Sequence, residues 1–236
     1  MEKKVQYIHI PNNLICTKEI NHNAIYLYMI LRMYSWDDKI TNIHKYISKS
    51  KVLLERLNWK DRKTLKKYLK QLKEYGYITY DFDNIKSGQD IEIFFIKQKY
   101  GKKYNNYFVE IEKEGLLKVI SIAKEIIIFE KDKITKKYIR KVIDLKEQAI
   151  RLFSYYCIKF KVHNDEEYNI SAYAFPSYST INKDIGIRDN NIKAINTNLH
   201  KGKILKVEIG DMFLNDDGRK VRERNHYIPL CKIKGK

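Results

Sequence analysis

Two segments of this chain share one order of sequence features, and this repeat constrains the fold more than any other property of the sequence. In each segment three apolar residues stand at positions i, i+3 and i+7, on one face of a helix, and a glycine follows. These positions are Leu65, Tyr68, Leu72 and Gly76 in the first segment, and Ile192, Ile195, Leu199 and Gly202 in the second. The sequence therefore predicts two copies of the order helix, turn, helix, glycine and strand.

The first copy is predicted to contain three helices between a leading strand and a closing hairpin. The elements are a strand at 7–10, helices at about 21–35, 43–57 and 61–75, and hairpin strands at 77–82 and 91–96. Pro11 ends the strand, Asn21 or Asn23 can cap the first helix, and Asp61 can cap the third. Gly76 is expected at the C′ position of that third helix.

The second copy is predicted to open with another short strand and to end with another hairpin. The elements are a strand at 107–111, helices at about 114–129 and 135–159, a helix, turn and helix from 181 to 200, and hairpin strands at 204–209 and 226–230. Gly186, Ile187 and Arg188 form the turn between the last two helices, and the hairpin turns at 216–218. The helices between 114 and 159 either join the two copies or form a dimer contact.

These segments resemble the winged helix-turn-helix superfamily. The clearest stretch runs from Ser179 to Leu199, and residues 53–78 form a looser match. In the looser match Asn58 stands where a turn glycine is usual, and Trp59 supplies the buried apolar residue after it. Two such segments in one chain look like the tandem winged-helix replication initiators of plasmids and phages, although winged helices also serve regulators and partition proteins.

The resemblance implies a mainly α fold with small β-hairpins, in the α+β class. It implies an N-terminal winged-helix domain over 1–104. A C-terminal winged-helix domain is then expected over 105–236, with the preceding strand and the connecting helices.

The charge balance points to a polyanionic partner. The chain carries 47 Lys and Arg against 29 Asp and Glu, a formal net charge of +18 at pH 7. Such an excess repels itself within a compact protein, and nucleic acid is the usual partner that compensates it. A genome rich in A·T codons is the alternative source of part of this charge, because lysines outnumber arginines severalfold.

The 61–75 helix is predicted to grip DNA without reading its sequence. A helical wheel places Leu65, Tyr68, Leu69 and Leu72 on the core side. The opposite side carries the candidate DNA-binding residues Lys63, Lys66, Lys67 and Lys70, with the candidate Arg62 and also Lys73 at its margin. Lysine acts as a flexible point charge that suits a phosphate backbone. The alternative is a solvated face in a lysine-rich protein.

The 189–200 helix has a different outward face, which is predicted to read A·T-rich sequence. This face carries Asn190, Lys193, Ala194 and Thr197, with Asn191 on its flank, and the candidate DNA-binding residues are Arg188 in the preceding turn, Asn190, Asn191, Lys193 and Thr197. Asparagine can pair with an adenine edge, and the methyls of Thr197 and Ala194 can contact thymine. The alternative is that these asparagines are merely solvated.

The second hairpin carries a local arginine cluster that codon bias does not explain. Its candidate DNA-binding residues are Arg219, Lys220, Arg222 and Arg224. A wing of this kind lies along phosphates or enters a narrow minor groove. The alternative is local pairing with Asp216, Asp217 and Glu223.

No motif in the sequence supports catalysis, so no catalytic residue, metal site or cofactor is expected. The P-loop pattern is absent, and the histidines form neither HExxH nor another metal-binding pair. Cys16, Cys157 and Cys231 are too far apart in sequence for a zinc motif. Because the most apolar run, 126–129, is far too short to span a bilayer, no membrane partner is expected and the location is expected to be cytoplasmic.

The sequence thus predicts a sequence-specific double-stranded DNA-binding protein without enzymatic activity. The favoured role is a plasmid or phage replication initiator that binds A·T-rich origin repeats and recruits host replication proteins. One alternative is a transcriptional regulator with the same DNA contacts. Another is a winged-helix scaffold that binds proteins. Whether the chain forms a homodimer is left open.

Overall fold

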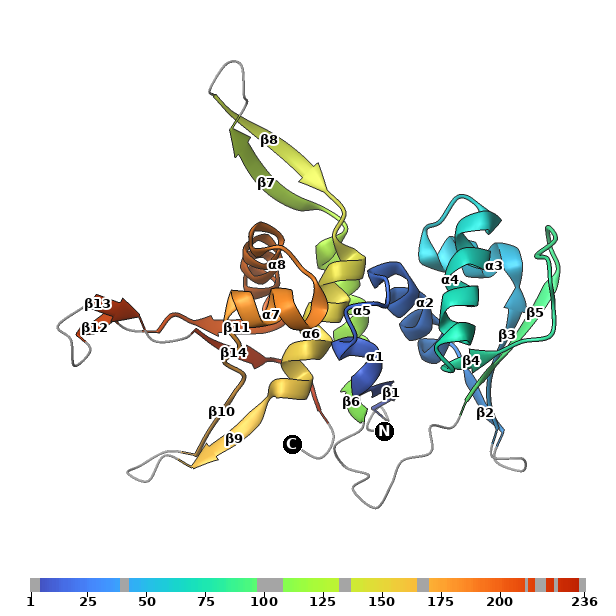
Figure 1. Cartoon of the computed structure of the whole chain (residues 1–236), viewed down its shortest axis with the longest axis horizontal. Helices are drawn as coiled ribbons and strands as arrows, with labels where there is room; N and C mark the ends of the chain where they lie inside the picture. Colours follow the sequence, from blue (N-terminus) through green and yellow to red (C-terminus); the bar gives the residue numbers. More distant parts are fainter. Residues whose placement is uncertain are drawn as a thin grey trace. The chain divides into compact units, whose positions relative to one another are not determined.

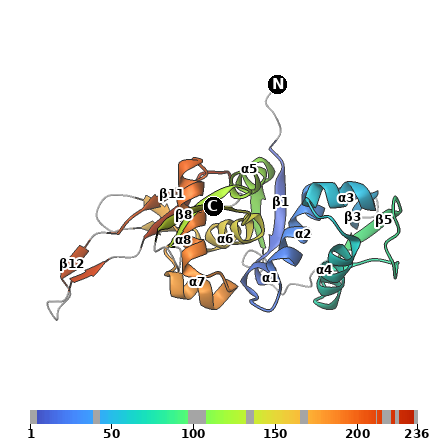
Figure 2. The same ribbon diagram turned by 90° about the horizontal axis from the view of Figure 1, so that it is seen from above.

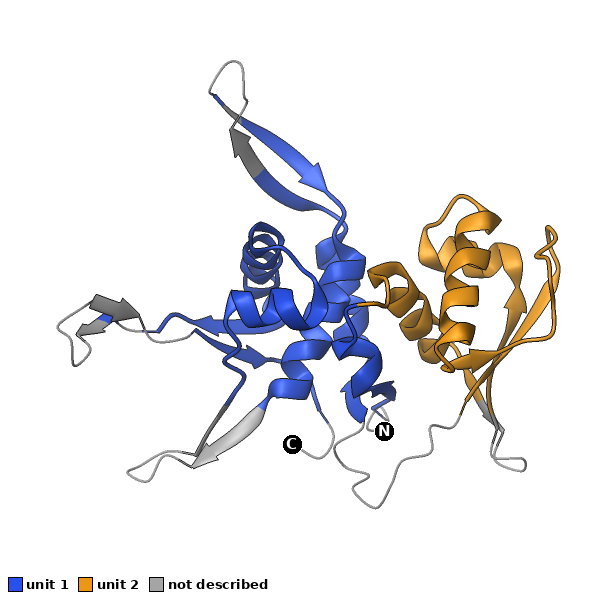
Figure 3. Ribbon diagram, viewed as in Figure 1, with its two compact units in different colours: residues 1–18, 108–236 blue, residues 19–107 orange. Residues whose placement is uncertain are grey.

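The computed structural model describes residues 5–38, 43–96, 108–131, 137–164, 170–210, 212–214, 220–222 and 225–233. It combines helices with small antiparallel sheets, which confirms the expected α+β class (Figure 1). The chain divides into two compact units (Figure 3). Unit 2 is Glu19–Tyr107, and unit 1 is Met1–Lys18 together with Phe108–Lys236. Unit 2 is therefore inserted into the sequence of unit 1.

The described residues of unit 2 form three helices and a four-stranded sheet. Its elements are α2 (His22–Met33), β2 (Trp36–Asp38), β3 (Ile43–Lys49), α3 (Ser50–Leu57), α4 (Arg62–Glu74), β4 (Ile78–Thr79) and β5 (Asp90–Phe95). The strands pair antiparallel in the order β2-β3-β5-β4. The hairpin that was expected to close the first copy is formed by β4 and β5. Strand β3 pairs with the other edge of β5.

Local sequence explains the ends of these helices. Asn21 caps α2 by accepting a hydrogen bond from the backbone N–H of Asn23, and Asp61 caps α4 through the N–H of Thr64. Asn58, at the end of α3, has the left-handed backbone conformation (φ 56°) that a turn glycine would take. The predicted caps at Asn21 and Asp61 are thus confirmed.

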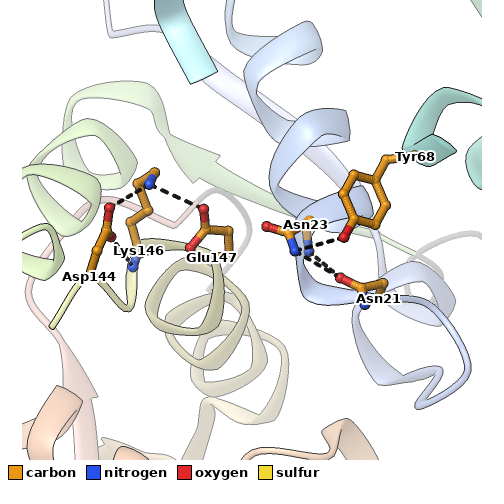
Figure 4. Close-up of polar contacts among 6 residues, drawn as sticks. All are labelled: Asn21, Asn23, Tyr68, Asp144, Lys146 and Glu147. Carbon is orange, nitrogen blue, oxygen red and sulfur yellow. Dashed lines mark hydrogen bonds and ion pairs between the residues drawn. The ribbon is translucent and has the colours of Figure 1, made fainter. Parts of the chain in front are cut away.

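The core of unit 2 fixes the orientation of α4. Leu65, Leu69 and Leu72 are fully buried, as the helical wheel predicted, and α4 packs against α2. The side-chain amide of Asn23 donates a hydrogen bond of 3.0 Å to the hydroxyl of Tyr68, which ties α4 to the start of α2 (Figure 4). The opposite side of α4 is therefore held toward solvent.

The first half of unit 1 joins two distant segments of the chain. Its elements are β1 (Tyr7–Pro11), α1 (Asn12–Cys16), β6 (Phe108–Glu112), α5 (Lys113–Ala123), β7 (Ile126–Lys131) and β8 (Tyr138–Ile143). Strands β1 and β6 pair antiparallel, with Tyr7 opposite Glu112, and β7 pairs with β8. The strands that were expected to open the two copies therefore form one sheet.

The second half of unit 1 contains the helices of the second copy. Its elements are α6 (Lys146–Lys159), β9 (Lys161–Asn164), β10 (Ile170–Tyr173), α7 (Tyr178–Ile185), α8 (Asp189–Lys201), β11 (Leu205–Glu208), β12 (Met212–Leu214), β13 (Lys220–Arg222) and β14 (His226–Pro229). The antiparallel pairs are β9 with β10, β11 with β14, and β12 with β13. Helix α5 packs against both α6 and α8 (Figure 2).

The two copies match more completely than the sequence indicated. The order α2-β2-β3-α3-α4-β4-β5 in unit 2 is repeated in unit 1 as α6-β9-β10-α7-α8-β11-β14, with the additional strands β12 and β13 between β11 and β14. In unit 2 the strand before the helix pair, β3, pairs with the last strand, β5. In unit 1 Ala174, directly after β10, forms the corresponding bridge with Tyr227 of β14. Each copy is thus a helix pair closed by a hairpin and one further strand.

Three predicted helices are wrong in part, because strands occupy some of their residues. The helix expected over 43–57 begins only at Ser50, since residues 43–49 form β3. The helix expected over 114–129 ends at Ala123, and the one expected over 135–159 begins at Lys146. The intervening residues form the β7–β8 hairpin, where β-branched residues pair across strands, and such pairing overrides helix periodicity.

The expected division into 1–104 and 105–236 also needs a correction. Residues 1–18 belong to unit 1, because β1 pairs with β6 and Arg151 of α6 binds the chain after α1. The guanidinium of Arg151 donates to the carbonyl oxygens of Ile15 (3.0 Å) and Thr17 (2.7 Å). Hydrogen bonds over such a sequence separation are invisible to local periodicity.

The glycine that follows each copy's second helix has a different role in the two copies. Gly76 has a φ of +73°, as a C′ glycine should, and the residue in the equivalent conformation after α8 is Lys203 (φ 55°). The N–H groups of the next residues, Tyr77 and Ile204, close both helix ends in the same way. Gly202 has an ordinary φ of −75°. The residue equivalent to Gly76 is therefore Lys203, and the predicted equivalence of Gly202 and Gly76 was wrong by one position.

Gly202 is required because of a close approach. A Cβ atom at this position would lie 2.3 Å from Cδ1 of Ile122 in α5. We expect Gly202→Ala to lower the free energy of unfolding by about 1–3 kcal/mol, because the added methyl overpacks the α5–α8 contact. Urea denaturation followed by circular dichroism measures this. Lys203→Gly is the neighbouring control, and it should be neutral or slightly stabilising because glycine accepts the positive φ. Equal stability of Gly202→Ala and the wild type would contradict this packing.

Candidate nucleic-acid interface

The predicted basic face of α4 lies on the solvent side of unit 2. Arg62, Lys63, Lys66, Lys67 and Lys70 are all exposed. Besides its contact with α2, the helix is held by Gln71, whose amide donates to the carbonyl oxygen of Glu19 (3.3 Å). The buried leucines and this hydrogen bond keep the cationic residues on one face.

The lysines of this face differ in their partners within the chain. Lys66 donates to the side-chain oxygen of Asn84 at 2.8 Å, and Lys70 lies 3.6 Å from the carboxylate of Glu74. Lys67 lies over the ring of Tyr68, 5.3 Å from its centroid. An exposed ion pair such as Lys70–Glu74 is weak, so a phosphate can compete for this lysine.

The outward face of α8 is confirmed for three of its predicted residues and corrected for one. Asn190, Lys193 and Thr197 are exposed, as is Arg188 in the preceding turn. Asn191 is half-buried, and its amide donates a hydrogen bond of 2.9 Å to Gln148 in α6. Asn191, which was predicted on the flank of this face, therefore helps to join α8 to α6.

The hydroxyl of Thr197 is also engaged within the helix. It donates to the backbone carbonyl oxygen of Lys193, one turn earlier, at 2.9 Å. This leaves the methyl group and the oxygen lone pairs toward solvent, so Thr197 can contact a thymine methyl or accept a hydrogen bond. Within the described part of the chain, the amide of Asn190 and the ammonium of Lys193 are the donors of this face that point to solvent.

A buried polar pair that the sequence analysis missed holds the inner face of α8. Asn196 is 4% exposed, and its amide exchanges hydrogen bonds with the hydroxyl of Tyr156 in α6, at 2.9 and 3.1 Å. The ring of Tyr156 stacks on Tyr227 of β14, with centroids 4.4 Å apart. Burial raises the pKa of Tyr156 well above its ordinary value. The sequence did contain a signal for this pair, because Asn196 lies one helical turn after Ile192 and therefore on the apolar face of α8.

The preceding helix, α7, is fixed to α6 by a second polar contact. The hydroxyl of Tyr155 donates a hydrogen bond of 2.6 Å to the carboxylate of Asp184. Burial, followed by this hydrogen bond, raises the pKa of Tyr155. The nearby thiol of Cys16 also has a raised pKa because of burial. These groups stay protonated at neutral pH and serve the packing of α7.

The predicted wing is described in part. Arg219 and Arg224 lie outside the described residues, as does the expected turn at 216–218. The backbones of Lys220 and Arg222 form β13, where they stand opposite Leu214 and Met212 of β12. The hairpin strands expected at 204–209 and 226–230 are confirmed as β11 and β14, and β12–β13 is an additional pair beyond them.

Comparison with family models, curated proteins and solved structures found no match to this chain. Across the described ranges, no group of three or more His, Cys, Asp or Glu side chains is placed to hold a metal ion. Among those same residues, no helix has the length and apolar character to cross a membrane. The candidate interface therefore rests on the geometry and chemistry of its own residues.

Proposed function

We propose that this chain is a sequence-specific DNA-binding protein with two tandem winged-helix domains, and that it acts as a replication initiator at A·T-rich origin repeats. The observation that carries the proposal is the repeated order of elements, in which α4 and α8 have equivalent positions, and we assign both as recognition helices. Each presents an exposed cationic or amide-bearing face, in a chain with a net charge of +18. A recognition helix of this kind enters the major groove.

The two faces support a division of labour. The α4 face carries five cations and no amide, so it suits sequence-independent contact with phosphates. The α8 face combines Asn190 and Thr197, which suit contact with base edges of A·T pairs, with Lys193, which suits a phosphate. Two unequal domains on one chain suit an asymmetric or bipartite site, which favours an initiator over a symmetric regulator.

The experiment is a selection from a pool of random duplexes with the full chain, followed by fluorescence anisotropy with the enriched and random sequences. We expect enrichment of A·T-rich sites with at least tenfold tighter binding than random duplex at about 0.15 M salt. Absence of any preferred sequence would contradict the proposal. In parallel, incubation with supercoiled DNA, Mg²⁺ and ATP should yield neither nicked circles nor released phosphate. To separate initiation from regulation, the enriched repeats are placed on a plasmid that lacks its own initiator, and replication of this plasmid in cells that express the chain is measured. Replication supports initiation, and its absence favours the regulator.

The neighbouring asparagines of α8 provide a matched pair for testing base readout. Asn190→Ala should relax the preference at one or two base positions, since a good bidentate contact contributes about 1–3 kcal/mol of discrimination. Asn191→Ala should leave base preference unchanged, because that amide is bonded to Gln148. Repeating the selection with both variants measures the difference. Equal effects of the two substitutions would mean that Asn190 does not read bases.

Lys193 is expected to act differently from Asn190 on the same face. Loss of one phosphate contact in Lys193→Ala should reduce the slope of log K against log salt by about 0.9. The base preference should stay as in the wild type. Salt titrations with enriched and random duplex measure both the slope and the preference. An unchanged slope would mean that Lys193 does not contact a phosphate.

A further inference from the structure

The β7–β8 hairpin forms a two-stranded ribbon beside α8, which the proposed recognition of DNA by α4, α8 and the wing does not use. Figure 1 shows this ribbon extending away from the helices of unit 1. The strands pair from Ile126 opposite Ile143 to Lys131 opposite Tyr138. The base of β7 packs against α8 itself, so the ribbon and the proposed recognition helix are neighbours within one unit.

The base of the ribbon is fixed by burial and by hydrogen bonds. Ile126 is fully buried, and the N–H of Leu145 donates to the carbonyl oxygen of Ala123 at 3.0 Å, which closes the hairpin across its two ends. Just beyond, the ammonium of Lys146 is nearly buried and contacts the carboxylates of Asp144 (2.6 Å) and Glu147 (3.2 Å; Figure 4). The base of the ribbon is therefore part of the packed core of unit 1.

The described part of the ribbon combines cations with exposed apolar side chains. Arg140 and Lys141 are exposed, and Ile127, Ile139 and Val142 are 41%, 52% and 55% exposed. Over 126–131 and 137–143 the sequence holds four cations and one acid, Glu130. Side chains alternate between the faces of a strand, so Arg140 lies on the face of Val142 and Lys141 on the face of Ile126, which packs inward. By the same register Glu130, opposite Ile139, shares the face of Lys141, whereas Lys131 shares the face of Arg140, so the cationic excess is concentrated on the face of Arg140.

We infer that the β7–β8 ribbon is an additional DNA-binding arm, which contacts the same duplex as α8. This inference rests on the proposed function of α8. A two-stranded ribbon fits a major groove, its Arg and Lys side chains can neutralise phosphates, and its isoleucine and valine methyls can contact thymine methyls. The cationic excess favours a polyanion as the occupant, because a second copy of a chain with a charge of +18 would meet like charge.

The test compares two double variants that remove the same charge. Arg140→Gln/Lys141→Gln changes the ribbon, and Lys118→Gln/Lys232→Gln changes two exposed lysines, one on α5 and one after β14. Glutamine keeps most of the side-chain length. Salt titrations with the enriched duplex should show a slope lower by about 1.8 for the ribbon variant, with about 30-fold weaker binding at 0.15 M salt. The control variant should stay within threefold of the wild type.

Hydroxyl-radical footprinting locates the contact. The ribbon variant should lose protection on one flank of the site and keep it at the bases read by α8. Equal affinity, slope and footprint for the two double variants would overturn the inference while leaving the proposed function intact. A wild-type chain that binds no duplex would overturn both.

The exposed apolar side chains allow a separate check for a protein occupant. Ile127→Ser/Val142→Ser should weaken DNA binding without changing the sedimentation coefficient of the free protein. If this variant turns a dimer into a monomer and keeps its DNA affinity, the ribbon is a contact between copies, and the inference is overturned.

Discussion

Replacing Arg151 by methionine should be among the most destabilising single substitutions in unit 1, with a loss of about 2–4 kcal/mol in the free energy of unfolding. Methionine fills a similar volume but donates no hydrogen bond. The carbonyl oxygens of Ile15 and Thr17 would then lose their donors, at a site where the arginine side chain is 1% exposed. A buried polar group without a partner costs about 1–3 kcal/mol.

Chemical denaturation in urea, followed by far-ultraviolet circular dichroism, measures this loss. Arg140→Met is the matched control, because Arg140 is exposed on the ribbon and its replacement should change stability by about 0.5 kcal/mol or less. The result would argue against the structural role of Arg151 if both methionine variants unfolded at the same urea concentration.

The double variant Lys63→Ala/Lys67→Ala should bind every duplex about 30-fold more weakly at 0.15 M salt, and its salt slope should fall by about 1.8. Neither lysine forms an ion pair among the described residues. Lys70 is left unchanged because it lies beside Glu74, so its replacement would also remove that ion pair. Because lysine contacts phosphates as a point charge, affinity for enriched and random duplex should fall by the same factor.

Fluorescence anisotropy over a range of salt concentrations provides both quantities for the two kinds of duplex. The double variant Lys118→Ala/Lys232→Ala removes equal charge at exposed positions outside both helix pairs and serves as the control. A selective loss for the enriched duplex would show that α4 reads bases, and our division of labour between α4 and α8 would then be wrong.

The parts of the fold that depend on neighbouring residues were predictable from the sequence. Helices α4 and α8 follow from apolar residues at helical spacing, and the cap at Asp61 and the turn at Gly186 follow from local hydrogen bonding and backbone freedom. The exposed faces of both helices follow from the same spacing, so most candidate residues on them were placed correctly.

The parts that depend on distant pairing were not predictable in this way. The strands β3, β7 and β8 occupy segments with apolar residues that also suit a helix, and only pairing across the sheet decides between the two. The inward turn of Asn191 depends on Gln148, and the burial of Asn196 depends on Tyr156, each from another helix. Such side chains look like solvated asparagines in the sequence.

The insertion of unit 2 between β1 and β6 has a consequence for synthesis of the chain. β1 emerges from the ribosome first, but its pairing partner follows only after residues 19–107 have been translated, roughly 5–20 s later. During that interval β1 is a strand without its partner β6, whereas unit 2 already holds all the segments that it packs together. Unit 2 can therefore form co-translationally, and unit 1 must wait to close around its own first residues.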